Sequence, residues 1–326
     1  MNHTVTIIGA GSWGTAIAAL LAGKGHKVTL CARRPELAAE LARTRENKAF
    51  LPGVTLPASI EIAHVARLEG AEWCFCAVPT RYIRAQFSAL GKWPAELPVV
   101  SLSKGIEQGT LKFPTEILRE VTGAAHYLTL SGPSHAEEVA RGLPTVLVSA
   151  GVETRAAALA ELMSTPAFRV YHSTDLRGVE LAGAAKNVVA IAAGIIDGLG
   201  LGDNAKAALL ARGLAEITRL GVAMGAEVRT FSGLSGVGDL YATCASRHGR
   251  NRAFGERIGR GEKPQAIIDS MEMEVEGFNT AAALQALAAR YDVEMPICDE
   301  VCRVLYEGAS PIDALKRLMT RNLKAE

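Results

Sequence analysis

The chain of 326 residues lacks an excess of charge of either sign, since 35 Lys and Arg residues stand against 34 Asp and Glu residues. A protein that coats nucleic acid or another polyanion carries a strong basic excess. We therefore expect no nucleic-acid partner, and any phosphate that the chain binds must be held locally.

Long apolar runs are also missing. Hydrophobic residues make up 49% of the chain, but we find no unbroken apolar stretch of about 18 residues that would span a membrane. A β-branched run starts at Val5 and leaves no room for a signal peptide before it. We expect a cytoplasmic protein without a membrane span.

The six cysteines form neither a CxxC pair nor the spacing of a disulfide-rich secreted domain. Cys74 and Cys76 alternate on an expected strand and so share one face, whereas Cys298 and Cys302 lie one helical turn apart. Nearby histidines do not complete a ligand set. We therefore expect buried free thiols and no metal site.

The sequence does contain a glycine pattern directly after an apolar run near its N-terminus: Gly9, Gly11 and Gly14. In a dinucleotide-binding turn the first glycine allows the tight turn and the second lets the backbone approach the pyrophosphate. The third lets the helix pack on the strand. Backbone N–H groups near Ser12 and Trp13 would face the anion at the helix N-terminus. We interpret the pattern as a dinucleotide site; the alternative is a glycine-rich turn without a ligand.

The end of the second apolar run, residues 27–31, indicates which dinucleotide binds. An NAD enzyme usually carries Asp or Glu at this point to accept a hydrogen bond from the ribose 2′-hydroxyl. This chain has Arg33 and Arg34 instead, and guanidinium groups suit a 2′-phosphate through charge and forked donors. We expect a preference for NADP(H), with NAD(H) as the second cofactor; the alternative is a pair of ordinary surface arginines.

Short apolar runs recur up to about residue 175, and almost only helical patterns follow. The length also favours two domains. We predict an α/β fold in which a Rossmann-type domain with a mainly parallel sheet, residues 1–180, precedes an all-α domain, residues 181–326. The expected strands are 5–8, 27–31, 73–78, 97–103, 126–130, 145–149 and 168–171. The expected helices include 35–45, 175–197, 204–225, 238–246, 251–259, 263–270, 279–291, 296–307 and 311–323, whereas 47–56 reads as a turn or loop and 59–66 is ambiguous.

Two lysines are candidates for chemistry. Lys104 comes just after an expected strand, and ligands bind at the carboxyl ends of strands in open α/β sheets. Lys186 lies among small apolar residues, where burial lowers a lysine pKa and a nearby anion opposes that shift. Because hydride addition to a carbonyl creates an alkoxide that needs a proton, Lys186 is a candidate proton donor; the alternative is a lysine whose ammonium reaches water. Asn187 follows it and is placed to hold a substrate oxygen.

Two polar groups lie further along the chain. Asp239 follows a glycine turn and shares a helix face with Thr243, although Asp239 has the alternative role of a helix cap. The second group is a basic segment that suits a small phosphate, unless it is a solvated loop. Its members are Arg247, His248, Gly249, Arg250, Asn251 and Arg252.

These motifs resemble those of the bacterial NAD(P)-dependent sn-glycerol-3-phosphate dehydrogenases over essentially the whole chain. The matching segments are GAGSWGTA at 9–16, LSKGIE at 102–107, LSGPS at 130–134, KNV at 186–188, GDL at 238–240 with TC at 243–244, RNR at 250–252 and VEG at 275–277. The resemblance implies reversible reduction of dihydroxyacetone phosphate to sn-glycerol 3-phosphate, the backbone precursor of phospholipids. It also suggests a homodimer.

The resemblance implies roles for single residues as well. Lys186 matches the proton acceptor for alcohol oxidation, and hence the donor for ketone reduction. From the residues and the resemblance together we also expect Lys104 and Asp239 to be catalytic, with Lys104 adding positive charge near the substrate and Asp239 orienting Lys186. On these combined grounds the expected substrate contacts are Lys104, Gly132, Ser134, Lys186, Asn187, Asp239, Thr243, Gly249, Arg250 and Asn251. The expected cofactor contacts are Gly9, Gly11, Ser12, Trp13, Gly14, Arg33, Arg34, Lys104, Ala136, Arg250 and Glu276.

Two positions depart from the family pattern: Gly249, where relatives often carry Ser, and Ser134, where many carry Thr. Two rival functions also remain open. A β-hydroxyacid or 6-phosphogluconate type dehydrogenase shares the two-domain plan and a helical-domain lysine. A non-catalytic NADP-binding sensor would leave Lys186 and Asp239 without a role.

Overall fold

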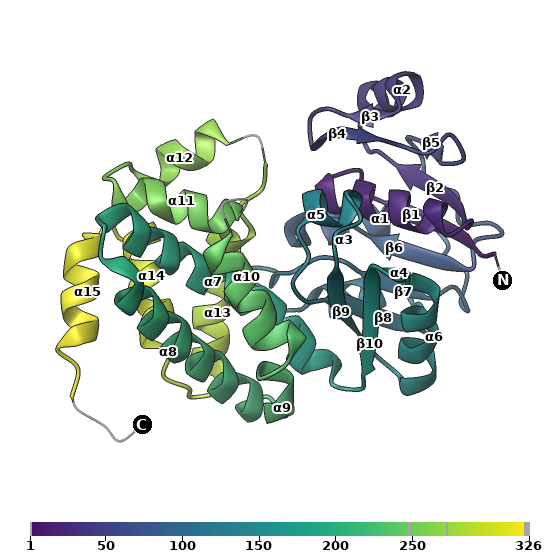
Figure 1. Cartoon of the computed structure of the whole chain (residues 1–326). Helices are drawn as coiled ribbons and strands as arrows, with labels where there is room; N and C mark the ends of the chain where they lie inside the picture. The colour runs from purple at the N-terminus through teal and green to yellow at the C-terminus, as the bar shows by residue number, and fades with distance from the viewer. Residues whose placement is uncertain (1, 247–248, 272, 323–326) are drawn as a thin grey trace. The chain divides into compact units, whose positions relative to one another are not determined.

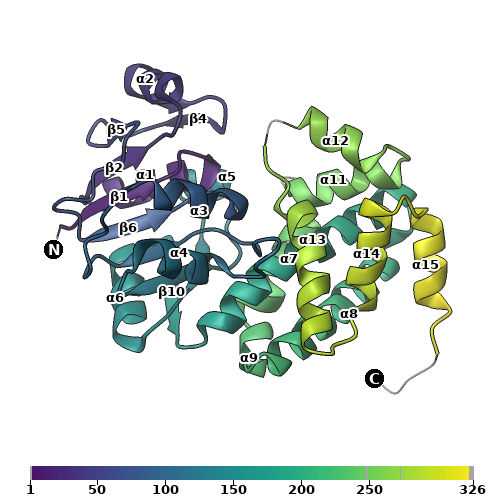
Figure 2. The same cartoon turned by 180° about the vertical axis from the view of Figure 1, so that it is seen from behind.

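The computed structural model describes residues 2–246, 249–271 and 273–322, which form two compact units (Figure 1; Figure 2). The first unit comprises Met1–Lys104 and Lys112–Glu180, and the second comprises Gly105–Leu111 and Leu181–Glu326. The sequence predicts an uninterrupted first domain, but the short segment Gly105–Leu111 groups with the second unit. There the Gln108 side-chain amide donates to the backbone carbonyl of Asn279 at 3.0 Å.

The first unit is built on an eight-stranded sheet in the order β10-β9-β8-β7-β6-β1-β2-β5. All neighbouring strands pair in parallel except β8 and β9, which are antiparallel. The mainly parallel Rossmann-type sheet expected from the sequence is therefore confirmed. The strands are β1 (Thr4–Ile8), β2 (Lys27–Cys31), β5 (Glu61–Ala63), β6 (Trp73–Cys76), β7 (Val99–Ser101), β8 (Tyr127–Ser131), β9 (Thr145–Ala150) and β10 (Phe168–Ser173).

Two hydrophobic cores cover the two faces of this sheet, because successive side chains on a strand point to opposite faces. Phe75 of β6 packs in the core that includes α1 (Ser12–Gly23) and α6 (Glu153–Met163). Cys74 and Cys76 pack in the other core, with α3 (Thr80–Ser88) and α4 (Pro114–Thr122). All six cysteines are buried free thiols, as expected, and burial raises the pKa of Cys74 well above its usual value.

The segment expected to be a turn or loop at 47–56 contains a small antiparallel hairpin instead. It consists of β3 (Glu46–Asn47) and β4 (Leu51–Thr55), which follow α2 (Pro35–Thr44). Pro52 and Gly53 are turn residues by local preference, but here they lie within β4. The strand is held by its neighbours in space: Leu51 is buried in the core, and the Leu56 N–H donates to the carbonyl of Arg45 at 2.7 Å. Tertiary packing therefore overrides the local signal.

The second unit is helical, as predicted. Two of its helices, α7 and α11, approach so closely that side chains are excluded between them. A Cβ on Gly194 of α7 would lie 2.0 Å from the Arg252 carbonyl oxygen, and one on Gly255 of α11 would lie 2.0 Å from the Ile191 carbonyl oxygen. The main helices are α7 (Leu176–Leu199), α8 (Gly202–Ala223), α10 (Asp239–Ala245), α11 (Arg250–Gly259), α12 (Pro264–Ser270), α13 (Glu276–Arg290), α14 (Pro296–Tyr306) and α15 (Pro311–Met319).

Helix α7 is long and apolar enough to cross a membrane by length and composition, although it contains no unbroken apolar run of that length. It carries Glu180, Lys186, Asn187 and Asp197, so the run is interrupted by polar residues. Of its most apolar window, 94% is buried within the protein. Such extensive burial is typical of a helix in the core of a protein.

A buried carboxylate connects the N-terminal part of α7, which belongs to the first unit up to Glu180, to α4. Glu180 accepts from the backbone N–H of Thr115 at 3.0 Å and from the Thr115 hydroxyl. Burial raises the pKa of Glu180 to about 8, although both hydrogen bonds from Thr115 lower it. The carboxyl group therefore keeps its proton in the folded protein at pH values where an exposed glutamate has lost it.

This raised pKa predicts a pH-dependent stability. Because folding favours the protonated form, the contribution of Glu180 is fully present below about pH 4.5 and is lost as pH rises toward 8, by about 1.4 kcal/mol per pH unit. Glu180→Gln removes the titrating group, so its free energy of unfolding should fall less steeply with pH than that of wild type. Urea unfolding between pH 5 and 8 measures the two slopes; Glu40→Gln, on the exposed face of α2, is the control. Equal slopes for wild type and Glu180→Gln would contradict the assignment.

Candidate active site

The glycine pattern forms the turn between β1 and α1. Gly9 adopts a left-handed φ of +114°, and a Cβ there would lie 2.5 Å from the Ala77 carbonyl oxygen. A Cβ on Gly14 would lie 2.0 Å from the Gly9 carbonyl oxygen. A Cβ on Gly11 would meet no described atom within 4 Å. The fold thus requires two of the glycines, whereas the third leaves open space beside the N-terminus of α1, where a ligand phosphate could approach the backbone.

Asn47 braces this turn, a role that no sequence motif indicates. Its buried side-chain amide donates to the Ala10 carbonyl at 3.0 Å and to the Thr15 hydroxyl at 2.8 Å. Asn47 follows α2 and lies far from the glycines in the sequence, so no local spacing could have identified it.

Ser12 and Trp13 begin α1, as expected, and the two arginines lie exposed just after β2. The Arg33 guanidinium lies 5.8 Å from the centre of the Tyr82 ring, and the Arg81 guanidinium lies 4.5 Å from the same ring. Cation–π contact of this kind restricts the guanidinium groups. No motif in the sequence marks Arg81 or Tyr82, although both follow Pro79 beyond the carboxyl end of β6.

A second set of predicted residues gathers beyond the carboxyl ends of β7 and β8. The Lys104 ammonium donates to the Gly132 carbonyl at 2.9 Å, and the Ser134 hydroxyl donates to the same oxygen at 2.9 Å. Gly132 has a φ of +129°, and a Cβ there would press against Leu147. Ala136 is buried at the start of α5 (Ala136–Ala140). The structure therefore brings together the sequence-predicted residues Lys104, Gly132 and Ser134.

In the second unit, Lys186 meets Asp239 in a buried ion pair. Their Nζ and Oδ1 atoms are 2.8 Å apart, with side-chain exposures of 8% and 2%. The ammonium also donates to the Thr243 hydroxyl, which lies one turn beyond Asp239. The shared face predicted for Asp239 and Thr243 is confirmed. Lys186 does not extend to water; its charge is compensated by Asp239 instead.

The backbone just before Asp239 differs from the glycine turn expected from the sequence. The segment expected to be a glycine turn is a π-helical turn, Leu234–Gly238, that runs directly into α10. A π turn widens the helix and often occurs at functional sites. A Cβ on Gly236 would lie 1.9 Å from the Phe231 carbonyl oxygen, so close backbone packing holds the turn.

Asn187 and Asn251 join three helices. The Asn251 amide donates to the Asn187 side-chain oxygen at 3.0 Å, and the Asn251 side-chain oxygen accepts from the Gly277 N–H at 2.9 Å. These bonds connect α7, α11 and the first turn of α13, where Glu276 is the first helical residue. The two asparagines therefore hold Lys186 and the start of α11 in a fixed relation.

The basic segment is described only in part, because Arg247 and His248 lie outside the described residues. Gly249 is the N-cap of α11, and a Cβ there would lie 2.8 Å from the Thr243 carbonyl oxygen. A serine at this position would require the backbone to shift, which accounts for glycine here. Arg250 is exposed and donates to the Glu274 carbonyl at 3.2 Å.

Comparison with known proteins adds independent information. Residues 4–157 match the family described as NAD-dependent glycerol-3-phosphate dehydrogenase N-terminus, and residues 175–316 match its C-terminus. A protein of Moorella thermoacetica named glycerol-3-phosphate dehydrogenase (NAD(P)+) is 46% identical, with 98% of this chain and 97% of the relative covered. A Geobacter protein of the same name is 47% identical, with 100% and 99% covered. The crystal structure of glycerol-3-phosphate dehydrogenase from Coxiella burnetii superimposes with a TM-score of 0.93 at 35% identity, with 98% of this chain and 99% of that chain covered.

The glycine turn generates a prediction on stability. Gly14→Ala places a methyl group against the backbone, so its melting temperature should fall by about 5 °C or more. Gly11→Ala places the same methyl group in open space at an ordinary φ of −76° and should stay within about 2 °C of wild type. Differential scanning calorimetry of both variants provides the test. A fall of equal size in both would show that the turn is not organised in this way.

Proposed function

Because this chain belongs to the NAD-dependent glycerol-3-phosphate dehydrogenase family, we propose that it catalyses the reversible reduction of dihydroxyacetone phosphate to sn-glycerol 3-phosphate. The observation that carries the chemistry is the buried Lys186–Asp239 pair, with Thr243 as a further partner of the lysine. We assign dinucleotide binding to the first unit and proton transfer to the second. The reaction would supply the glycerol phosphate backbone of phospholipids in the cytoplasm.

The residues of the first unit fit a nicotinamide dinucleotide. Open space at Gly11, beside the N-terminus of α1, suits the pyrophosphate, and Arg33 and Arg34 suit a 2′-phosphate. When bound, the dinucleotide supplies or accepts the hydride. We assign the remaining cofactor contacts to Gly9, Ser12, Trp13, Gly14, Lys104, Ala136, Arg250 and Glu276.

Lys186 is the residue that moves the proton. As an ammonium group it protonates the alkoxide oxygen that develops at C2 of the ketone, and as an amine it accepts the proton in the reverse direction. Asp239 lies 2.8 Å from Nζ and fixes the direction of the ammonium. Lys104 contributes a second positive charge toward substrate oxygen.

The remaining polar residues bind and orient the substrate. We assign this role to Gly132, Ser134, Asn187, Thr243, Gly249, Arg250 and Asn251. Arg250 offers forked donors to the phosphate, so that binding of a non-reacting group positions the reacting carbon.

We also propose a homodimer. Exposed apolar residues of the second unit, Val222, Val228 and Tyr241, offer contact area for a second copy, with exposures of 48%, 59% and 66%. Light scattering should give twice the chain mass of 34.4 kDa, and the monomer mass at micromolar concentration would refute the proposal.

The proposed activity is tested by following NADPH oxidation by the purified protein. Dihydroxyacetone phosphate should support turnover, whereas unphosphorylated dihydroxyacetone and a β-keto acid should not, because they lack the phosphate that orients the substrate. Turnover with the keto acid would favour a hydroxyacid dehydrogenase instead. Cofactor binding without any turnover would favour a sensor.

Lys186→Ala should lower kcat by roughly two to four orders of magnitude, the usual contribution of a general acid. The matched control is Lys206→Ala, which removes another lysine that pairs with an aspartate, Asp197, at 2.5 Å. Because Lys186→Ala leaves Asp239 without its charge partner, Lys186→Arg is measured as well; it keeps the charge but cannot transfer the proton. More than about a tenth of wild-type kcat in either variant would exclude Lys186 as proton donor.

Arg33→Ala should reduce the preference for NADPH over NADH, measured as the ratio of the two kcat/KM values. Loss of a guanidinium that contacts the 2′-phosphate weakens NADPH binding and leaves NADH nearly unaffected. Arg43→Ala, in the last turn of α2, serves as the control arginine. A wild-type ratio below one that Arg33→Ala leaves unchanged would contradict the assignment.

A further inference from the structure

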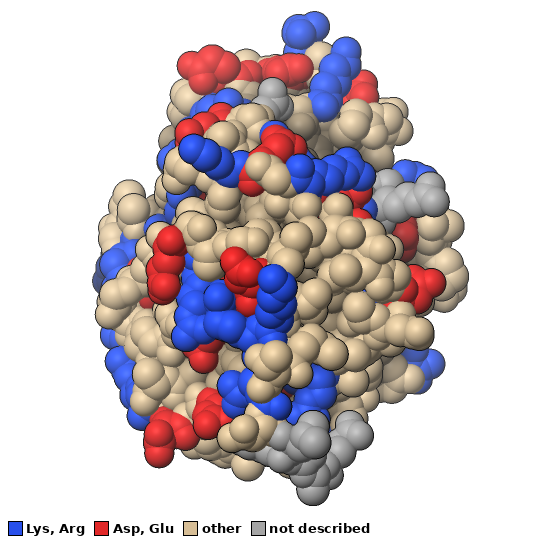
Figure 3. Space-filling model, turned by 90° about the vertical axis from the view of Figure 1, so that its left-hand side faces the viewer, with Lys and Arg blue, Asp and Glu red and all other residues tan. Residues whose placement is uncertain are grey.

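A cluster of arginines on α14, on α15 and just after α15 has no role in the function proposed above. None of the residues assigned to cofactor or substrate lies on these two helices. On the face of the molecule that carries α15, basic side chains gather around a few acidic ones (Figure 3). The cluster consists of Arg303, Arg317 and Arg321, with side-chain exposures of 44%, 42% and 43%.

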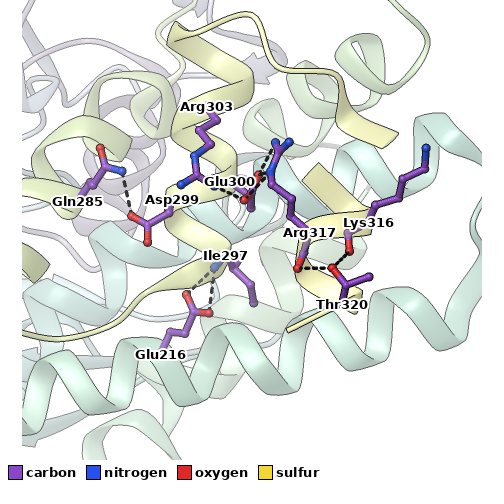
Figure 4. Close-up of polar contacts among 9 residues, drawn as sticks. All are labelled: Glu216, Gln285, Ile297, Asp299, Glu300, Arg303, Lys316, Arg317 and Thr320. Carbon is purple, nitrogen blue, oxygen red and sulfur yellow. Dashed lines mark hydrogen bonds and ion pairs between the residues drawn. The ribbon is translucent and has the colours of Figure 1, made fainter. Parts of the chain in front are cut away.

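Glu300 orients two of these arginines. Its carboxylate is nearly buried, with a side-chain exposure of 7%. Arg317 donates to it through Nε at 3.0 Å and through Nη2 at 2.7 Å, the forked geometry that fixes a guanidinium plane. Arg303 donates to the same carboxylate from the other side (Figure 4). One negative charge therefore holds two positive charges, and donors of both guanidinium groups remain for another acceptor.

A small cavity adjoins these groups. Its volume is about 180 Å³, and its lining includes Arg303, Arg317 and Arg321 together with Asp299 and Glu300. Asp299 turns toward Gln285, whose amide donates to it at 2.9 Å (Figure 4). The lining thus carries three positive and two negative charges, and the Glu294 carboxylate that pairs with Arg321 adds a third negative charge beside it. A volume below the range of about 300–1,000 Å³ that drug-sized ligands occupy restricts the occupant to a small molecule.

The surroundings hold the cavity in shape. The buried Glu216 of α8 accepts from the Ile297 N–H with both carboxylate oxygens, at 3.0 and 3.1 Å, and so fixes the first turn of α14 (Figure 4). Arg219 donates to the Glu294 carbonyl at 3.0 Å, and Arg321 pairs with the Glu294 carboxylate at 3.0 Å. Binding groups that are fixed in advance lose little conformational entropy when a ligand arrives.

We propose that this cavity, the arginine pocket, binds a small phosphate group, either free or as a phosphate monoester. A phosphate monoester carries a charge of about −1.5 to −2 at pH 7 and three acceptor oxygens, which match three guanidinium groups. The forked donors of these guanidinium groups favour this dianion over a neutral ligand. The inference goes beyond the proposed function, because it needs neither the dinucleotide nor the catalytic lysine.

The test is isothermal titration of the full chain with inorganic phosphate at low ionic strength. The titration uses the Arg250→Met variant with saturating NADP+. This combination suppresses phosphate binding at the proposed substrate site and at the proposed dinucleotide site. We expect one remaining phosphate per chain, whose Kd rises at least tenfold on Arg317→Met. The control is Arg260→Met. Arg260 is an exposed arginine at the end of α11, away from the arginine pocket, where it pairs with Glu256, so this variant should leave the Kd for phosphate unchanged.

Arg321→Met guards against a folding defect, because Arg321 pairs with exposed Glu294 and does not contact Glu300. It should also weaken binding, by at least threefold. A second titration with sn-glycerol 3-phosphate distinguishes the source of the phosphate: tighter binding than inorganic phosphate identifies an ester, and weaker binding identifies the free ion. Two results would overturn the proposal: no phosphate binding by the Arg250→Met protein with saturating NADP+, or equal Kd values for phosphate in that protein and in its Arg317→Met and Arg321→Met variants.

Discussion

Close contact between backbones, made possible by the absence of a Cβ atom, is the constraint on which both units depend. In the first unit, Gly14 lets α1 lie against the turn that follows β1. In the second, Gly194 and Gly255 let α7 and α11 pack backbone to backbone. Any side chain at these positions would separate the elements by more than the turn or helix pair allows. The residues proposed for chemistry lie on the elements that make these contacts, since Ser12 begins α1, Lys186 lies on α7 and Arg250 begins α11.

The second feature common to the structure is the way in which buried charge is compensated. Lys186 is paired with Asp239, Glu180 accepts from the N–H and hydroxyl of Thr115, and Glu216 accepts from the N–H of Ile297. A buried group without such partners would cost several kcal/mol. Only one of the three is an ion pair, and there the charged forms stabilise each other. Burial instead raises the pKa of Glu180 to about 8 and of Glu216 to about 7. Where proton transfer is proposed, the buried carboxylate Asp239 is thus paired with a lysine, whereas Glu180 and Glu216 have no such partner among the residues that the structure describes, and their pKa values are raised.

Much of the fold could be predicted because the strands of the sheet are short apolar runs with clear ends, and because the glycine spacing indicates one particular turn. The helices of the second unit could be predicted because helical patterns follow one another along this part of the sequence, with almost no strand patterns between them. The hairpin of β3 and β4 was not predictable, because Pro52 and Gly53 signal a turn and only packing of Leu51 overrides them. The π turn before Asp239 was missed because four residues, Ser235 to Gly238, look like a flexible loop unless the neighbouring backbone of Phe231 is known.

The sequence by itself determined the class of fold, the dinucleotide motif, and which lysine is a candidate for proton transfer, because each depends on residues close together in the chain. Tertiary structure decided which groups these residues meet. Lys186 contacts Thr243 across 57 positions, and Asn251 contacts Asn187 across 64. The bracing of the glycine turn by Asn47, the contact of Arg33 with the Tyr82 ring and the pairing of Arg317 with Glu300 likewise join separate segments of the chain. Local spacing carries no information on such contacts, since they exist only after the hydrophobic cores have brought the elements together.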